Sequence, residues 1–413
     1  MLLLTRECTL DTMSRLLPRR GYICLRCLSQ SKRGYATTST LPPAPPASGA
    51  AKIANRRLIS LQGQDASKFL QGITSNNVRP DSRTGFFAAF LTAQGKVLHD
   101  VFVYPTPGSQ WHADKAKADD PGYLVEIDAA QASNLLAHLK RHKLRSKLQL
   151  RLLEEGELEI WSAWKEEEKW TPHPSTFGEN TEGAAAGVDA DGSLSLVDTR
   201  ASGMGRRVLL PPTSSGSSLA SHRTLSGLEE APTSAYTIRR YLRGVAEGQD
   251  EIPRDNAFPM NTNIDLMGGI DFKKGCYIGQ ELTIRTHHTG VVRRRILPVA
   301  LFDSADGAPD KIGYSPDTKF ALPEHDADIK IEGKRGRPGK WINGVGNIGI
   351  AMCRLEMMTD LVVTGEPSTY NPQDQFTIRT GNESGEQELG IKAFVPDWVR
   401  GKMRAPKMQK RVE

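Results

Sequence analysis

Short apolar runs alternate with polar residues from residue 53 onward, and this period of two predicts β-strands. The first strands are expected at residues 58–61, 86–92, 96–104 and 122–128. The second and third of them are separated by a short stretch that contains Gln94-Gly95, which predicts a hairpin. The first part of the chain is therefore expected to form a sheet of short strands.

Helical patterns occur between these strands. One begins at Asp65, a residue type favoured at helix N-caps, and ends at Gly72. A second follows Asp128 and carries three leucines on one face, and a third runs from Pro232 to Gly244. Sheets with flanking helices predict an α+β fold.

The pattern changes in the last third of the chain, where β-rich runs are separated by stretches of Gly, Pro and Asp. These runs lie at residues 291–301, 345–353 and 391–395. We expect a small β-barrel or sandwich over 291–400, followed by a basic tail over 401–413. Two aperiodic stretches, 165–192 and 211–231, are expected to be surface insertions in a core that spans 53–290.

The first 35 residues are rich in arginine and leucine and poor in acidic residues, which is typical of a mitochondrial transit peptide. Arg33-Gly34-Tyr35 resembles a site of the mitochondrial processing peptidase, so the mature chain is expected to begin near Ala36. A disordered basic tail is the alternative. The Pro-rich stretch that follows predicts a disordered linker over residues 36–52.

The net charge of +6 comes mainly from the first fifty residues, which hold seven basic and two acidic side chains. The rest of the chain is nearly neutral, so no nucleic-acid partner is expected. The composition, 38% hydrophobic and 25% charged, is typical of a soluble globular protein. No apolar stretch is long enough to predict membrane insertion.

Three of the five cysteines lie in the expected transit peptide, and Cys276 and Cys353 remain. Two thiols cannot form a disulfide framework, which agrees with a reducing compartment such as the mitochondrial matrix. They are also too few to hold a permanent iron-sulfur cluster, which normally takes four cysteine ligands. Cys276 remains a candidate for one ligand of a cluster shared with a partner.

The densest chemistry lies in the motif Lys274-Gly275-Cys276-Tyr277-Ile278-Gly279-Gln280-Glu281. The glycines allow close backbone approach, and Lys274 is expected to favour the thiolate of Cys276. Gln280 and Glu281 are expected to open a helix whose N-terminus would also stabilise a thiolate. A buried, inert thiol is the alternative for Cys276, because most lone cysteines are of that kind.

Arg285, His287 and His288 follow this motif and raise the question of a zinc site. Zinc normally takes three or four protein ligands, and the spacing of these residues does not supply them. Hydrogen-bonding or surface histidines are therefore expected. No Gly-rich phosphate loop or nucleophile elbow occurs in the required context.

Residues 263–290, with Phe69–Asn76 and Phe90–Tyr104, resemble the YgfZ-like branch of the glycine-cleavage T-protein family. The resemblance implies a folate-binding-type α+β core of antiparallel sheets and a C-terminal β-barrel. It also implies a role in maturing mitochondrial [4Fe-4S] proteins together with A-type scaffold partners. In that role Cys276 would contact a transient cluster or a partner thiol, and the other motif residues would shape the contact loop.

The resemblance further implies a folate pocket with Asp100, Arg240 and Asn263 as candidate residues for tetrahydrofolate. Two departures argue against an aminomethyltransferase: His99 replaces one of a pair of aspartates, and Leu242 stands where the T-protein has a glutamate. Each removes a carboxylate that could bind a pterin or position an amine. A folate-dependent one-carbon transferase that uses Asp100 and Arg240 stays open as the alternative function, with folate binding unresolved.

Overall fold

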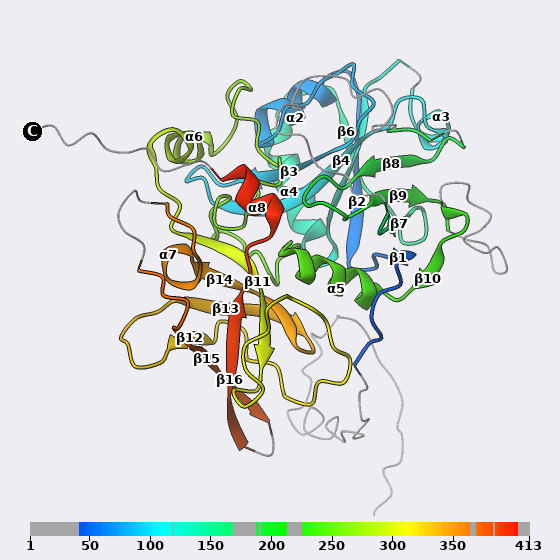
Figure 1. Cartoon of the computed structure of the whole chain (residues 1–413). Coiled ribbons are helices and arrows are strands. Elements are labelled where there is room, and N and C mark those ends of the chain that lie inside the picture. Colours follow the sequence, from blue (N-terminus) through cyan, green and yellow to red (C-terminus); the bar gives the residue numbers. More distant parts are fainter. Residues whose placement is uncertain are drawn as a thin grey trace, which may run out of the picture. The chain divides into compact units, whose positions relative to one another are not determined.

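Figure 1 shows the computed structural model of the chain. The structure describes residues 41–117, 119–167, 187–189, 191–212, 225–363, 369–382 and 385–403. The expected transit peptide lies outside these residues, as do most of the two expected insertions and residues 404–413 of the expected basic tail.

The first sheet contains the four strands expected from the sequence, together with a fifth. Its antiparallel order is β3 (Phe86–Leu91), β4 (Val97–Pro105), β5 (Gly122–Asp128), β2 (Arg56–Gln62) and β6 (Gln149–Leu152). The predicted hairpin joins β3 to β4, and Gly95 adopts a φ of 80° in its turn. The strand β6 escaped prediction because it is only four residues long.

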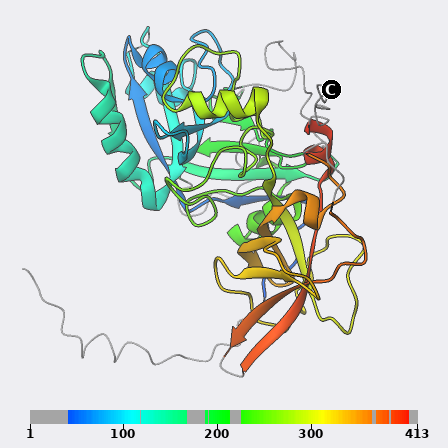
Figure 2. The ribbon, with the colours of Figure 1, turned by 90° about the vertical axis from the view of Figure 1, so that its left-hand side faces the viewer.

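Two helices, α2 (Ala66–Ile73) and α4 (Ala132–Lys143), cover one face of this sheet (Figure 2). Alternate strand residues such as Ile59 and Val101 pack beneath them. The predicted end of α2 at Gly72 is wrong, because the helix continues to Ile73. Asp65 occupies the N-cap position as predicted, but its carboxylate accepts a bond from the backbone of Lys147 instead of capping the helix.

The opposite face of the first sheet packs on a second sheet that the sequence did not reveal. Its order is β10 (Glu229–Ala231), β1 (Ser48–Lys52), β7 (Glu159–Lys165), β9 (Arg206–Leu210) and β8 (Leu194–Val197). The insertion expected over 211–231 thus ends inside a strand of this sheet. Phe102 from the first sheet and Trp164 from the second belong to the shared core.

The disordered linker expected over 36–52 is wrong for its described part. Residues 48–52 form β1, which pairs with both β7 and β10. The proline-rich residues before β1 are held by side-chain donors, since Trp164 Nε1 donates to the Pro46 carbonyl at 2.9 Å and the Tyr314 hydroxyl donates to Pro42. Tertiary hydrogen bonds thus order a segment whose composition alone favours a linker.

Two shorter elements complete the core together with two longer helices. The shorter ones are α3 (Gln110–Lys115) and the 3-10 helix η1 (Ala129–Gln131), and the longer ones are α5 (Thr233–Arg243) and α6 (Gln280–Thr289). The predicted stop of α5 at Gly244 is confirmed, with a left-handed φ of 69° at that glycine. The 36 residues between α5 and α6 are turns and loops that carry most of the motif.

The C-terminal region is a closed six-stranded barrel, which confirms the β-barrel alternative. Its strands are β11 (Arg294–Phe302), β14 (Ile348–Arg354), β13 (Gly339–Val345), β12 (Asp328–Ile331), β15 (Phe376–Asn382) and β16 (Gly385–Ala393), and two short helices, α7 (Leu355–Met358) and α8 (Asp397–Lys402), accompany them. Trp398 Nε1 in α8 donates to the carbonyl of Arg243 at 2.9 Å. The barrel is therefore bonded to the end of α5.

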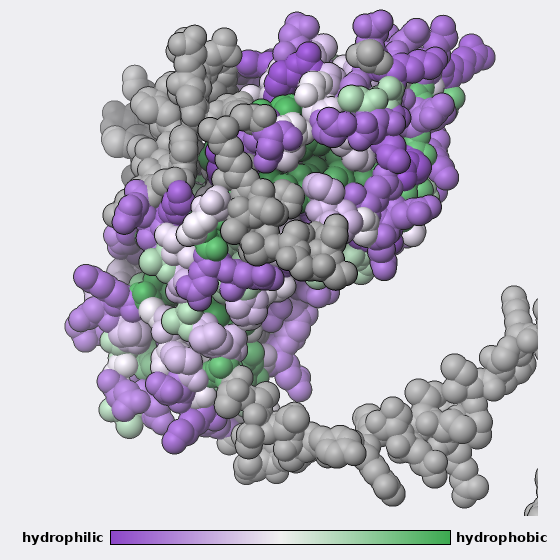
Figure 3. Space-filling view, turned by 90° about the vertical axis from the view of Figure 1, so that its right-hand side faces the viewer, coloured by the Kyte–Doolittle hydropathy of each residue, from purple (hydrophilic) through white to green (hydrophobic). Residues whose placement is uncertain are grey.

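Hydrophilic residues predominate on the face drawn in Figure 3, where hydrophobic residues appear in small separate groups. Among the residues that the structure describes, none of the helices combines the length and apolar character needed to cross a membrane.

Candidate functional site

The motif lies on a loop that approaches the end of α2 and then enters α6. The backbone N–H of Asp271 donates to Ser75 at 3.1 Å, and that of Ile278 donates to Gly72 at 3.3 Å. Asn76 also reaches the start of this region, since its side-chain amide donates to the Gly268 carbonyl at 2.8 Å. The loop is thus fastened at both ends to the last turn of α2 and the residues that follow it.

Cys276 is exposed at the tip of this loop and carries a free thiol. Its neighbour Gly275 is exposed too, and a side chain at that position would meet nothing within 4 Å. The second described cysteine, Cys353, is buried in the barrel, where burial raises the pKa of its thiol to about 12. Exposure makes Cys276 the accessible thiol of the two, which removes the alternative of a buried, inert residue for it.

Lys274 has a different role from the one expected. Its ammonium donates to the carbonyls of Gln71 at 2.8 Å, Thr74 at 2.7 Å and Asn76 at 2.9 Å. These three bonds use every donor of the group, and burial lowers the pKa of Lys274 to about 8. The expectation that Lys274 activates the Cys276 thiol is therefore corrected: the side chain clamps the loop to carbonyl groups at the end of α2.

The predicted helix opening at Gln280 and Glu281 is confirmed, because α6 begins at Gln280. Gly279 precedes it with a left-handed φ of 83°, and a side chain there would collide with the Thr92 carbonyl in the β3–β4 turn. Gln280 accepts a bond from the backbone of Tyr277 at 3.2 Å. Gly279 and Gln280 thus fix the path of the chain after Cys276.

Tyr277 anchors the loop through its buried side chain. Its side chain is buried, burial raises the pKa of its hydroxyl to about 12, and Lys274 Nζ lies 4.9 Å from the centre of its ring. The side chains on the two sides of Cys276 thus point into the protein while the thiol faces solvent. This arrangement presents one thiol on a well-anchored loop.

The residues of α6 expected to support the motif are on or near its surface. Arg285, His288 and Glu281 are exposed, whereas His287 is half-buried and stacks on Phe272 with ring centres 3.5 Å apart. In the part of the chain that the structure describes, no group of three or more His, Cys, Asp or Glu side chains is placed to hold a metal ion. His287 thus packs against Phe272, and His288 lies at the surface.

Asp100, the first candidate for a folate pocket, lies in a fully buried network of charges. Its carboxylate accepts a bond from Arg56 Nη1 at 2.8 Å and another from the backbone N–H of Gly248 at 3.2 Å. Arg56 Nε donates in turn to Glu126 at 2.9 Å. Both oxygens of Asp100 are therefore occupied by groups of the protein itself.

Glu126 is the centre of this network. It accepts bonds from Arg56, from Arg207 and from the Tyr104 hydroxyl, the last at 2.7 Å. Burial alone would raise the pKa of Glu126, but the guanidinium groups of Arg207 and Arg56 lower it overall. Further charged members of the network are Asp198, Arg200 and Glu247.

The other two folate candidates, Arg240 and Asn263, also bond to groups of the protein itself. Arg240 forms a two-pronged ion pair with Glu251, at 2.7 and 2.9 Å. The side-chain amide of Asn263 donates to the Ile296 carbonyl at 2.7 Å, and its oxygen accepts a bond from Arg295. Asp100, Arg240 and Asn263 thus each bond to different groups of the protein itself, whereas Arg240 Nε is buried without a hydrogen-bond partner among the described residues.

Most residues of this network carry no signal in the sequence. Arg200, Arg207 and Glu247 are single charges in unremarkable contexts, and only their complete burial and mutual pairing distinguish them. A charged residue inside an otherwise apolar strand is a weak indication of such pairing, and Arg207 in β9 is of that kind.

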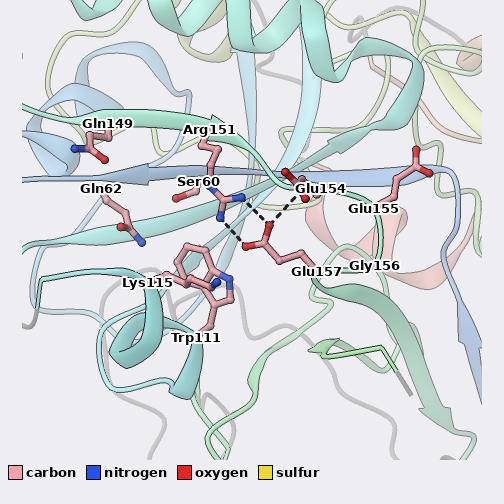
Figure 4. Close-up of a pocket in the computed structure, with 10 residues that line it drawn as sticks. All are labelled: Ser60, Gln62, Trp111, Lys115, Gln149, Arg151, Glu154, Glu155, Gly156 and Glu157. Atoms are coloured by element: carbon pink, nitrogen blue, oxygen red, sulfur yellow. Dashed lines mark hydrogen bonds and ion pairs between the residues drawn. The ribbon is translucent and has the colours of Figure 1, made fainter. Parts of the chain in front are cut away.

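A cavity of about 580 Å³ lies at the edge strand β6 (Figure 4). Trp111 and Lys115 of α3 line it, and so do Arg151 and Glu157, which are joined by two bonds of 2.6 Å. No residue of the motif lines this cavity. The exposed thiol and this polar cavity are therefore separate features.

Comparison with known proteins identifies the barrel and the whole chain. Residues 293–401 match the family described as CAF17, C-terminal beta-barrel domain. The structure is similar to the crystal structure of glycine cleavage system aminomethyltransferase T from Bartonella henselae, with a TM-score of 0.55 and 12% identity over 87% of each chain. At that identity the similarity concerns the fold alone, and it confirms the expected T-protein-like architecture.

Curated relatives extend over nearly the full length. The chain is 43% identical to the mitochondrial iron-sulfur cluster assembly factor IBA57 homolog of Aspergillus fumigatus, over 92% of this chain and 89% of the relative. It is 43% identical to the homolog of the same name from Pyricularia oryzae, over 93% of both chains. These similarities agree with the expected mitochondrial location. The chain belongs to the family of the mitochondrial iron-sulfur cluster assembly factors IBA57.

Proposed function

We propose that this protein assists the assembly of iron-sulfur clusters on mitochondrial [4Fe-4S] proteins in the matrix, with an A-type scaffold protein as partner. The observation that carries the proposal is the exposed thiol of Cys276 on a loop fixed by Lys274 and Gly279. The names of the relatives support the same function.

In this function Cys276 supplies one ligand to a cluster whose remaining ligands come from the partner. The thiol loses its proton to solvent as its sulfur bonds to an iron ion, and no electron transfer is needed for that step. A single exposed thiol is suited to such sharing, because a partner can approach it without opening the fold. The buried Cys353 cannot play this part, since the barrel encloses it.

The anchored loop contributes geometry. The clamp of Lys274 on three carbonyls and the buried ring of Tyr277 hold the backbone on both sides of the thiol. A ligand that is already positioned loses less conformational entropy when the shared cluster forms. We therefore assign Lys274, Tyr277, Gly279 and Gln280 to positioning, and Cys276 alone to contact with the cluster.

The test replaces Cys276 with Ser in cells that lack the native protein, and measures aconitase activity and protein lipoylation. We expect the variant to accumulate normally and to leave both readouts at the level of the deletion. Cys353→Ala is the matched control, because it removes the other described thiol without touching the loop, and it should restore both readouts. Full rescue by Cys276→Ser would remove Cys276 from the mechanism.

A folate-dependent transferase is the second function that the sequence raised, and no contact in the structure favours it. The carboxylate of Asp100 and the guanidinium of Arg240 are each paired internally. No reaction step is therefore assigned to folate.

A further inference from the structure

A groove with a volume of about 340 Å³ runs along α6 where the core meets the first barrel strand. We call it the α6 groove. Its apolar lining includes Phe258, Leu282 and Val291, and its charged lining consists of Arg293, Arg294 and Arg354. None of its lining residues belongs to the motif Lys274–Glu281.

The apolar lining reaches solvent to an unusual degree. Phe258 is 37% exposed and Val291 is 48% exposed, and both are among the few large hydrophobic residues at the described surface with such exposure. An exposed apolar patch beside charged residues is characteristic of an interaction site. Phe258 and Val291 line the same groove, so together they form one exposed apolar surface.

The groove is held in shape by hydrogen bonds between its walls. The backbone N–H of Ile296 donates to Asn261 at 2.8 Å, and Arg295 donates to the Met260 carbonyl at 2.6 Å. Arg295 is also paired with Asp265, at 2.8 and 2.9 Å. A surface that is already formed needs little rearrangement to receive a ligand.

The charges of the groove are one-sided. Three arginines line it and no aspartate or glutamate does. Within the described part of the chain, Arg293 and Arg294 form no ion pair, whereas Arg295, the next residue, is buried and paired. Two exposed guanidinium groups therefore lie at the rim of an apolar groove, where they can bind carboxylates.

The groove is continuous with the contact loop through α6. Leu282 lies in the first turn of that helix, after Gly279, and six positions from Cys276. Gly95 of the β3–β4 turn lines the groove and also packs on Gly279. The groove and the contact loop therefore adjoin the same helix.

We propose that the α6 groove docks an acidic segment of the scaffold that shares the cluster with Cys276. An apolar side chain of that segment enters between Phe258 and Leu282, and flanking carboxylates pair with Arg293 and Arg294. This inference rests on the proposed function and adds a second contact to it. The thiol binds the cluster, and the groove recognises the protein that carries it.

The experiment measures the affinity of the full chain for the apo form of the A-type scaffold, by titration at two salt concentrations. The test variant is Arg293→Glu/Arg294→Glu, and Arg335→Glu/Arg337→Glu is the control with the same change in net charge on an exposed barrel loop. We expect the test variant to bind about 10-fold or more weakly and the control less than about 2-fold. Raising the salt concentration should weaken wild-type binding more than binding of the test variant.

Two further variants separate docking from cluster binding and from folding. Val291→Asp alters the apolar lining in an exposed loop and should weaken docking while thermal unfolding stays unchanged. Cys276→Ser should dock the apo scaffold like the wild type and fail to share a cluster. Together they distinguish loss of the groove from loss of the thiol.

The inference is overturned if both charge reversals weaken docking equally, and the proposed function then stands without the groove. Absence of any scaffold binding by the wild type would reject the groove and the proposed partner together. Binding to vesicles that contain an anionic lipid, lost only in the Arg293/Arg294 variant while scaffold binding is retained, would assign the groove to a membrane instead and overturn the proposal.

Discussion

The loop around Cys276 and the charged interior around Asp100 are the two places where the sequence concentrates chemical groups, and they differ in access. Cys276 is exposed and its thiol is free. Asp100 and Glu126 are fully buried, and their oxygens accept bonds from arginines, a tyrosine and a backbone amide. The thiol of Cys276 is open to solvent, whereas the carboxylates of Asp100 and Glu126 are paired inside the protein.

This difference separates reactivity from stability. A buried carboxylate that is fully paired can hold the two sheets together, but it has no free acceptor for a substrate. An exposed thiol on a fixed loop contributes little to the core and can be shared with another protein. A T-protein-like architecture can thus serve a role in which the chemistry takes place at its surface.

The largest effect is expected from breaking the interior. Glu126→Ala leaves the guanidinium groups of Arg56 and Arg207 buried without their shared carboxylate, which should cost about 3–5 kcal/mol of unfolding free energy. Urea denaturation measures the loss. Asp360→Asn is the control, because its pair with Arg400 lies at the surface and should contribute less than about 1 kcal/mol. An equal loss of unfolding free energy in both variants would mean that solvent reaches the interior pair as it reaches the surface pair.

The loop can be tested with two of its own glycines. Gly279→Ala forces a side chain into a left-handed conformation against the Thr92 carbonyl and should destabilise the protein by about 2–4 kcal/mol. Gly275→Ala points into open space and should change stability by less than about 0.5 kcal/mol. Thermal and denaturant unfolding of both variants provide the measurement. If both substitutions are tolerated equally, the motif is not anchored as described.

Features that depend on neighbouring residues could be predicted from the sequence, whereas features that depend on residues far apart in the chain could not. The β3–β4 hairpin and the end of α5 at Gly244 follow from local turn chemistry, and both were predicted correctly. The strand β1 was missed because its residues, Ser-Gly-Ala-Ala-Lys, have little intrinsic preference for strands. Its pairing with β7 and β10 comes from segments more than a hundred residues away.

The same reason limits the prediction of the site. The motif was found because its glycines and its thiol are contiguous, and the start of α6 at Gln280 followed from its residues. The role of Lys274 was misread, because its partners lie about two hundred positions earlier, in residues 71–76. Nothing near Lys274 in the sequence indicates that three carbonyls would occupy its ammonium.

Acid should weaken the interior through His99, which lies fully buried on β4. Burial lowers the pKa of His99 from 6.5 to about 3, so the unfolded chain takes up a proton below pH 6.5 while the native protein stays neutral. Stability therefore falls as the pH drops below 6.5, by about 2 kcal/mol at pH 5. Unfolding of His99→Leu, compared with the wild type at pH 8 and pH 5, should lack this increment. An unchanged increment would assign the acid sensitivity to other groups.

A smaller effect is expected from Lys274→Met. The substitution removes a charged donor from three carbonyls and should cost about 1–3 kcal/mol of unfolding free energy. The rate at which iodoacetamide alkylates Cys276 should change by less than about 3-fold, because the ammonium is directed at the carbonyls. Lys273→Met is the control in the same loop, since Lys273 is exposed. A fall of ~10-fold in alkylation would restore the role of thiolate activation to Lys274.

The smallest effect is expected from tetrahydrofolate. Titration calorimetry with the full chain should show no saturable binding, because a pterin would have to displace Arg56 or Gly248 from Asp100 inside a fully buried network. The same sample should contain protein that docks the scaffold, which serves as the positive control. Saturable binding with a dissociation constant below about 100 µM would mean that the interior opens to solvent. The buried network and the Cys276 loop would then both be accessible to ligands. Without binding, the T-protein-like core acts in this protein as a rigid support for one exposed thiol.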